Sequence, residues 1–363
     1  MRPHWSITDW IAVLPKSELQ VNAQNEFEID SSYAFTHVRF HIYPDGGVAR
    51  LRVYGEVVPE WHREGGLNGE IDLAAVEHGA QVLTCSDMFF GPKHNLIMPG
   101  RAHNMSDGWE TRRRRGPGND WVIVQLATEA IVRRVEIDTT HFKGNYPDTC
   151  SIDVDGRELL PRTKLLPDTR HVFVDELQEA GPISQLRLNV YPDGGVARLR
   201  VYGTATEAGR QREVVRRLNT RIDASADLRK CCASSAWVKR MNDARPFADW
   251  DDVVAKADAF WSEANESDCR EALAAHPRIG EKRAGWSSQE QSRVTPNEAL
   301  ADVNRRYEEK FGHVFLICAT GKSADDILAA ARERIGKTPE QERQNAAAEQ
   351  GKITKLRLLK LVE

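Results

Sequence analysis

The sequence predicts two kinds of domain in one chain: all-β jelly-roll sandwich repeats, followed by an all-α helical domain. Three observations predict this organisation. The string YPDGGVARLRVYG occupies residues 43–55 and recurs, letter for letter, at residues 191–203. Short segments in which apolar and polar residues alternate surround both copies, which is typical of β-strands. After Gly203 this alternation gives way to apolar residues at helical spacing.

The repeated string marks two copies of a domain-sized unit, because the copies lie much farther apart than the roughly 20–50 residues of solenoid repeats. Residues 63–205 hold the second copy together with a long segment before its string, roughly residues 80–150. No counterpart of that segment precedes the first copy within this sequence. We therefore expect residues 1–62 to be only the last part of a first repeat, with either a start farther upstream or an incomplete first sandwich.

Within each copy, the repeated string predicts an antiparallel hairpin. In the first copy, residues 38–42 and 49–53 alternate between apolar and polar side chains, and Pro44-Asp45-Gly46-Gly47 between them is typical of a turn. Two further strands are predicted at residues 121–126 and 132–138. Several short strands of this kind predict a β-sandwich such as a jelly roll.

The region 206–363 is predicted to be all-α. Residues 204–209, where it begins, are small and polar, which is typical of a linker. Asp325 and Asp326 near its start, with Gly336 after its end, predict a helix over residues 323–335. Apolar residues recur at helical spacing in two other places: Val253, Ala257, Phe260 and Trp261 in one, and Ile353, Leu356, Leu359 and Val362 in the other.

Composition and charge exclude several classes of protein. The 50 Lys and Arg residues nearly balance 54 Asp and Glu residues, and the net charge of −4 excludes a generally basic nucleic-acid binder. The four consecutive arginines at 112–115 are too short a run to indicate a nucleic-acid partner. No stretch approaches the roughly 18 apolar residues of a membrane span, and residues 1–6 lack the apolar core of a signal peptide. We therefore expect a cytoplasmic protein with no nucleic-acid or membrane partner.

Longer strings show two resemblances that together cover nearly the whole chain. Residues 1–205 resemble allantoicase, a family built of two repeated jelly-roll domains, through DGWETRRRR at 107–115, HFKGNYP at 141–147 and both copies of the repeated string. Residues 212–363 resemble 2-oxo-4-hydroxy-4-carboxy-5-ureidoimidazoline (OHCU) decarboxylase. The strings that carry this second resemblance are CC at 231–232, RPF at 245–247, AHP at 275–277, SSQEQ at 287–291, FLICA at 315–319 and KITKLRL at 352–358.

The two resemblances imply neighbouring steps of purine and ureide catabolism. One family decarboxylates OHCU to (S)-allantoin, and the other hydrolyses allantoate to ureidoglycolate and urea. The resemblance therefore implies a bifunctional enzyme that acts on small ureides and forms a homo-oligomer through its helical domain. Loss of CO2 from OHCU leaves a carbanion that the substrate's own C=N and C=O groups delocalise, so we expect no cofactor.

The decarboxylase chemistry still requires a placed proton, and His276 suits that role because an imidazole gives or takes a proton near neutral pH. Pro277 directly after it stiffens the backbone. Glu290 is the second catalytic candidate, as a carboxylate that steers His276. The alternatives are a helix-capping role for His276 and a capping box formed by Ser287 and Glu290, which are three residues apart.

By the same resemblance, two further segments and one arginine line the substrate site. Arg357 is expected to fork onto the substrate carboxylate, and its alternative is a solvated surface arginine. The predicted substrate-binding residues are Pro277, Ser287, Ser288, Gln289, Glu290, Gln291, Phe315, Leu316, Ile317, Cys318, Ala319 and Arg357.

The allantoicase candidates are polar residues that could bind urea-like N–H groups or a carboxylate, or activate water: Glu110, Arg112, Asp120, His141, Asn145, Tyr146 and Arg198. The alternative for each is a role in a turn, a cap or strand pairing. If the two repeats pack by pseudo-symmetry, Arg50 and Arg198 face one shared site. No metal is predicted, because the histidines near Asp87 are scattered without ligand spacing. A competing hypothesis makes the sandwich region a binding or oligomerisation module, since sandwiches often bind without catalysing.

Overall fold

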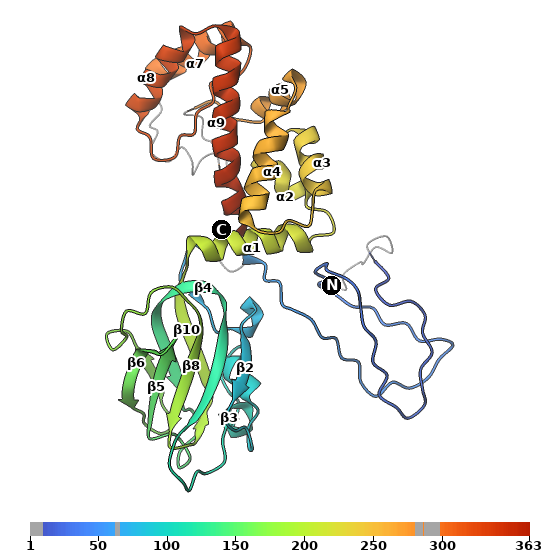
Figure 1. The fold of residues 1–363 in the computed structure, drawn as a ribbon, viewed down its shortest axis with the longest axis vertical. Coiled ribbons are helices and arrows are strands. Elements are labelled where there is room, and N and C mark those ends of the chain that lie inside the picture. The colour runs from blue at the N-terminus through green and yellow to red at the C-terminus, as the bar shows by residue number, and fades with distance from the viewer. Residues whose placement is uncertain (1–9, 62–65, 280–285, 287–297) are drawn as a thin grey trace.

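The computed structural model describes residues 10–61, 66–279, 286 and 298–363. In Figure 1 a β-sandwich lies at one end of the molecule and a group of helices at the other. The N-terminal segment, residues 10–60, extends to one side and contains neither helix nor strand. The predicted order of a β-sandwich followed by an all-α region is therefore confirmed.

The sandwich is built around one long strand, β4 (Asp120–Asp138). Its first part pairs with β2 and β8, and its second part pairs with β10 and β7. All of these pairings are antiparallel. Because β4 pairs with β2 and β8 in its first part and with β10 and β7 in its second, it joins the two groups of strands that form the sandwich. The other strands are β1 (Ile71–Asp72), β2 (Gln81–Cys85), β3 (Trp109–Glu110), β5 (Thr149–Val154), β6 (Arg157–Lys164), β7 (Arg170–Phe173), β8 (Ile183–Tyr191), β9 (Gly195–Val196) and β10 (Arg198–Ala205).

The structure corrects two predictions about the second copy. The segments 121–126 and 132–138 are strands, but both belong to β4, whose pairing shifts register between Gln125 and Ala130. The predicted hairpin is wrong, because β8 and β10 do not pair with each other. Each pairs with a different part of β4 instead, so the repeated string carries the chain from one group of strands to the other.

The hairpin predicted for the first copy is also wrong, because residues 38–42 and 49–53 form no strand. Leu51 and Val53 are 54% and 59% exposed, whereas their counterparts Leu199 and Val201 are completely buried. In the second copy these residues pair with β4. No strand is present in residues 10–60 to pair with the first copy as β4 pairs with the second, and an unpaired strand is not stable alone.

The all-α region has local capping signals at its helix ends. The predicted helix at 323–335 is confirmed as α8 (Ala324–Ile335), with a capping box between Ser323 and Asp326 and with Gly336 as C-cap. The other α-helices whose bounds lie within the described residues are α1 (Glu207–Thr220), α2 (Ser225–Cys231), α3 (Ser235–Asp243), α4 (Trp250–Ser262), α5 (Glu266–Ala274), α7 (Glu298–Phe311) and α9 (Pro339–Leu359).

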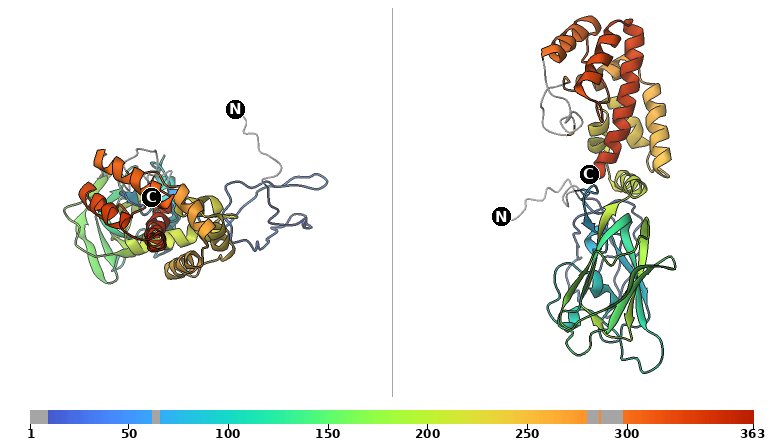
Figure 2. Two further views of the ribbon diagram at one scale, coloured as in Figure 1. Left: turned by 90° about the horizontal axis from the view of Figure 1, so that it is seen from above. Right: turned by 90° about the vertical axis from the view of Figure 1, so that its left-hand side faces the viewer.

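Helix α1 joins the two regions directly, so the predicted linker at 204–209 is wrong. β10 ends at Ala205, and Thr206 caps α1 by accepting a hydrogen bond from the amide of Gly209. α1 lies between the sandwich and the other helices in Figures 1 and 2. Its Val214 and Leu218 are buried in the same apolar core as the sandwich strands. The small and polar residues at 204–209 therefore cap α1 and do not form a linker between two domains.

Candidate functional site

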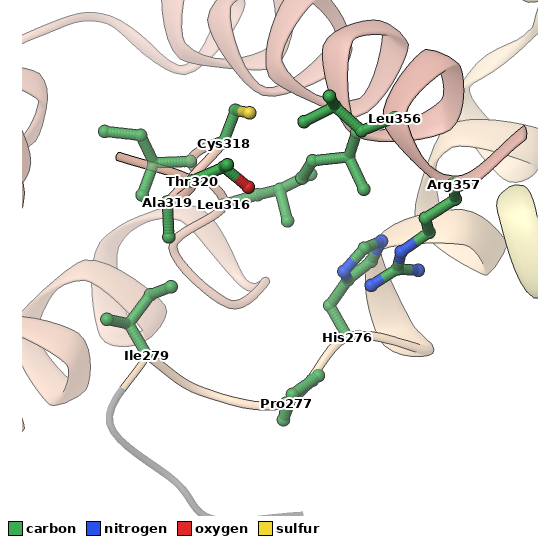
Figure 3. A pocket seen from close by; sticks show the side chains of 11 residues that line it. His276, Pro277, Ile279, Leu316, Cys318, Ala319, Thr320, Leu356 and Arg357 are labelled. Atoms are coloured by element: carbon green, nitrogen blue, oxygen red, sulfur yellow. The ribbon is translucent and has the colours of Figure 1, made fainter. Parts of the chain in front are cut away.

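A pocket in the helical region lies between the turn after α5, the segment 315–320 that follows α7, and the C-terminal half of α9 (Figure 3). It holds about 370 Å³ of empty space, part of which is open to solvent. The pocket is lined by His276, Pro277, Ile279, Leu316, Ile317, Cys318, Ala319, Thr320, Ile353, Leu356 and Arg357.

His276 is placed by the end of α5 and by a contact with α9. The backbone N–H of His276 donates to the carbonyl of Leu273, which closes the last turn of the helix. His276 is 9% exposed, and its Nε2 atom lies 2.7 Å from Oε1 of Gln350, a completely buried residue of α9. Figure 3 shows the guanidinium of Arg357 beside the imidazole. A titratable ring and a permanent cation therefore meet at one wall of the pocket.

Charged side chains from two helices hold the segment 315–320, called the clamped segment, of which residues 316–320 line the pocket. Arg334 of α8 donates to the carbonyl of Leu316 at 2.9 Å, and the amide of Cys318 donates to the Glu349 carboxylate of α9 at 2.7 Å. Burial works to raise the pKa of Glu349, but hydrogen bonds from Lys352 and the Cys318 amide outweigh it and hold that pKa below its usual value. The segment thus presents a fixed backbone to the pocket.

Most of the predicted decarboxylase residues that the structure describes meet at this pocket: His276, Pro277, Leu316, Ile317, Cys318, Ala319 and Arg357. Phe315 does not line it. Its ring is 1% exposed and packs against Tyr307, with 5.1 Å between the ring centroids. Glu290 and the rest of residues 287–291 lie outside the described residues.

Sequence reasoning missed several residues of the site: the lining residues Ile279, Thr320, Ile353 and Leu356, and Gln350 behind His276. Ile279, Ile353 and Leu356 are apolar, so their side chains carry no reactive group. A signal existed for Gln350, because it lies seven residues before Arg357 and so shares a face of α9 with it.

Three of the allantoicase candidates, Glu110, Asp120 and Asn145, lie where the segments 110–120, 145–147 and 192–195 meet. Tyr146 follows Asn145 directly. Asn145 donates to the Glu110 carboxylate at 2.5 Å, and the Asn145 carbonyl accepts a hydrogen bond from the amide of Gly195. Asp120 is 1% exposed and accepts hydrogen bonds from Arg114 and from the Ser86 hydroxyl. Tyr146 is half-buried and packs against the core. Every carboxylate in this group already has a protein partner.

Arg112 and His141 lie in surface loops with other neighbours. The guanidinium of Arg112 lies over the exposed ring of Phe89, 4.3 Å from its centroid. His141 has a positive φ of 74°, and its Nε2 atom lies 3.0 Å from the carbonyl of Ala102.

Arg198 is a buried residue that holds loops together. It is 4% exposed and donates to the carbonyls of Asn95 and Gly100 at 3.1 and 3.2 Å. It also pairs with the Asp107 carboxylate at 3.1 Å. The shared site expected for Arg50 and Arg198 is absent from the described structure, because Arg50 lies exposed in the strandless N-terminal segment.

The part of the chain that the structure describes lacks two further features. That part contains no group of three or more His, Cys, Asp or Glu side chains arranged to hold a metal ion. It also contains no helix that is both long and apolar enough to cross a membrane.

Two family models match the chain. The allantoicase repeat model matches residues 2–58 and 71–206, and the OHCU decarboxylase model matches residues 211–359. Both describe enzyme domains of ureide catabolism.

Curated relatives match the N-terminal part. The probable allantoicase of Pseudomonas fluorescens (strain SBW25) is 50% identical over 216 residues, which cover 55% of this chain and 65% of that protein. The allantoicase of Dictyostelium discoideum is 49% identical over 210 residues, covering 53% of this chain and 56% of that protein. The chain therefore spans less than two thirds of the length of each.

Solved structures match each part of the chain. The allantoicase of Saccharomyces cerevisiae is 44% identical with a TM-score of 0.40, and the match covers 45% of this chain and 49% of that one. A crystal structure of OHCU decarboxylase in the presence of (S)-allantoin is 36% identical with a TM-score of 0.35, covering 38% of this chain and 97% of that one. Because the allantoicase repeat model alone covers more than half of the sequence, the chain belongs to the allantoicase family, and an OHCU decarboxylase domain follows its allantoicase repeat segment.

Proposed function

We propose that the helical region decarboxylates OHCU to (S)-allantoin. One observation carries the proposal: His276 and Arg357 lie side by side at a pocket whose opposite wall is the clamped segment 315–320. The fork of the Arg357 guanidinium matches a substrate carboxylate, and the imidazole of His276 transfers a proton.

In the proposed reaction the C–C bond to the carboxylate breaks and its electron pair passes into the C=N and C=O system of the imidazoline ring. CO2 leaves, and a proton held by His276 goes to the carbon that carried the carboxylate. Ile353 and Leu356 form an apolar wall that limits water near this carbon. Glu290 belongs to the proposal as the carboxylate that steers His276, and residues 287–291 belong to it as substrate contacts. Phe315 supports the segment 315–320 from the core side.

The test is the formation of (S)-allantoin from freshly generated OHCU, followed by circular dichroism against the spontaneous decay of the substrate. We expect His276→Ala to lower the rate about 100-fold or more, because general acid catalysis contributes about 10²–10⁴-fold. His313→Ala is the matched control, since His313 packs against Tyr307 and Phe311 away from the pocket. A near-normal rate in His276→Ala would refute the assignment.

We also propose that the sandwich region hydrolyses allantoate to ureidoglycolate and urea. The paired Glu110 and Asn145, with Asp120 in the same group of loops, support this proposal as groups that bind ureido N–H donors. Urea release from allantoate by the purified chain is the measurement. We expect Glu110→Gln to abolish it while leaving OHCU decarboxylation unchanged.

A second candidate is a sandwich that binds ligands or other subunits without catalysis. Two observations favour it: the first copy forms no strand, and Arg198 is committed to holding loops. Absence of urea release from a chain that still decarboxylates OHCU would support this candidate. Urea release at an enzymatic rate would exclude it.

We propose further that the chain forms a homo-oligomer through its helical region and takes small ureides as its partners. The support is the family resemblance of that region. Size-exclusion chromatography with light scattering measures the molar mass of the protein. A mass of one chain at every concentration used in the activity assays would contradict the proposal.

A further inference from the structure

Behind the imidazole of His276 lies a short chain of buried hydrogen bonds. His276 Nε2 lies 2.7 Å from Gln350 Oε1, and Gln350 Nε2 donates to the Thr354 hydroxyl at 3.1 Å. That hydroxyl donates to the backbone carbonyl of Gln350 at 2.9 Å. Gln350 is completely buried and Thr354 is 5% exposed, so water does not compete with these bonds.

Counting donors and acceptors along this chain assigns the orientation of the Gln350 amide. The Thr354 hydroxyl, which also lies beside the Cys232 thiol, donates to the carbonyl of Gln350 and accepts from the Gln350 amide. These hydrogen bonds place the NH2 group of Gln350 toward Thr354 and the amide oxygen toward His276. An amide oxygen only accepts, so His276 Nε2 must carry a hydrogen.

A neutral imidazole carries a hydrogen on one ring nitrogen and a lone pair on the other. The contact with Gln350 therefore decides which nitrogen of His276 has the lone pair. When Nε2 carries the hydrogen, Nδ1 is the nitrogen at which the neutral ring takes up a proton. Among the described residues, the titratable and charged groups around this site include Arg357 of α9, Cys318 and the Glu349 carboxylate that its amide bonds, and Cys232 next to Thr354. Burial raises the pKa of the Cys232 thiol to about 11, so that group stays neutral near pH 7.

We propose that Gln350 is a positioning residue that holds His276 as the Nε2–H tautomer, so that the working proton is taken up and delivered at Nδ1. This inference rests on the decarboxylation proposed above and deepens it. Gln350 touches no reacting atom in this scheme, and it acts only by fixing the tautomer and the ring plane of His276.

Kinetics of two variants form the first part of the test. Gln350→Met keeps the length of the side chain but removes the acceptor, whereas Gln350→Glu keeps an acceptor at the same place. We expect Gln350→Met to lower kcat about tenfold or more with KM changed less than about threefold, and Gln350→Glu to recover a large part of the loss. Gln344→Met is the matched control, because it makes the same change at an exposed position of the same helix.

The tautomer itself is read by nuclear magnetic resonance of the full chain labelled with ¹⁵N-histidine, with the His276 signals identified by their loss in His276→Ala. We expect a protonated Nε2 and an unprotonated Nδ1 in the wild type, and a changed distribution in Gln350→Met. A wild-type ring protonated on Nδ1 alone would overturn the proposal, as would a Gln350→Met variant with unchanged kcat and tautomer.

Failure of the proposed function gives a different result. If the wild type does not decarboxylate OHCU at all, the function is wrong, and the resonance measurement still decides whether Gln350 sets the tautomer. If Gln350→Met fails to fold by circular dichroism, the kinetics of Gln350→Glu and the wild-type tautomer decide in its place.

Discussion

At the scale of single residues, one buried carboxylate connects the core of the helical region to the pocket wall. Glu342 is completely buried and accepts hydrogen bonds from Arg334, one of them at 2.8 Å, and from the Tyr307 hydroxyl. Burial raises the pKa of Tyr307 well above its usual value, and Glu342 adds to that increase. Arg334 reaches on to the carbonyl of Leu316 in the pocket wall. The charge of Glu342 therefore keeps a buried guanidinium paired where it supports the site.

We expect Glu342→Ala to lower the free energy of unfolding by about 3–5 kcal/mol, because it leaves the buried Arg334 without its counter-ion. Tyr307→Phe removes only one neutral donor and should cost about 1–2 kcal/mol. Urea unfolding of both variants measures the difference. A loss below about 1 kcal/mol in Glu342→Ala would show that Arg334 finds another partner.

A second residue, Asp227 of α2, gives a pH dependence with a definite sign. Burial works to raise the pKa of Asp227, but hydrogen bonds and charge from Arg217, with Lys230, outweigh it and hold the pKa below its usual value. A depressed folded-state pKa means that ionised Asp227 stabilises the fold above the unfolded-state pKa of about 3.9. That contribution is lost as the pH falls through the lower folded-state value.

Asp227→Asn should therefore be less stable than the wild type at pH 7 and should lose less stability on acidification. Urea unfolding at pH 7 and near pH 3 measures both free energies. An equal difference between the two proteins at both pH values would contradict the assignment of the depressed pKa to Asp227.

At the scale of elements, the repeated string shows how far tertiary context decides strand formation. The same letters form β9 and β10 in the second copy and no strand in the first. In the second copy β10 pairs with β4 along its whole length. The string itself is identical in the two copies, and what the second copy has in addition is β4 as a pairing partner.

Chymotrypsin should distinguish the two copies, because the bond after Tyr54 and the bond after Tyr202 lie in identical strings. Tyr54 is 85% exposed in the strandless segment, whereas Tyr202 is half-buried in a paired strand beneath the guanidinium of Arg134. We expect cleavage after Tyr54 well before cleavage after Tyr202, since a protease needs locally unfolded backbone. Mass spectrometry of a time course measures the order, and equal rates would show that the first copy folds as the second does.

At the scale of the whole molecule, the sandwich and the helices share one core at α1. The Trp61 indole donates to Glu213 of α1 at 2.9 Å, and the amide of Leu67 donates to the carbonyl of Val362 near the C-terminus. The segment that leads into the sandwich and the C-terminal end of the chain therefore meet beside α1. Small polar residues are typical both of linkers and of helix N-caps. The predicted linker was wrong because Thr206 is the N-cap of α1.

The candidate site was predictable where a short string carries chemistry. The strings around His276, Leu316 and Arg357 predict residues that the structure places at one pocket. Gln350 and Phe315 show the limit of such strings. A glutamine in a helix carries no sign of the imidazole it will meet. Phe315 packs against Tyr307 in the core, although the residues that follow it in its motif line the pocket.

The sequence by itself determined the duplication, the order of β-sandwich and all-α regions, and the bounds of α8, because repeats, alternation and capping residues are local properties. The tertiary structure alone decided which strands pair with β4, that the first copy forms no strand, and which residues surround His276. These outcomes depend on hydrogen bonds and burial between residues far apart in the chain. A local pattern does not specify which distant partner will supply them.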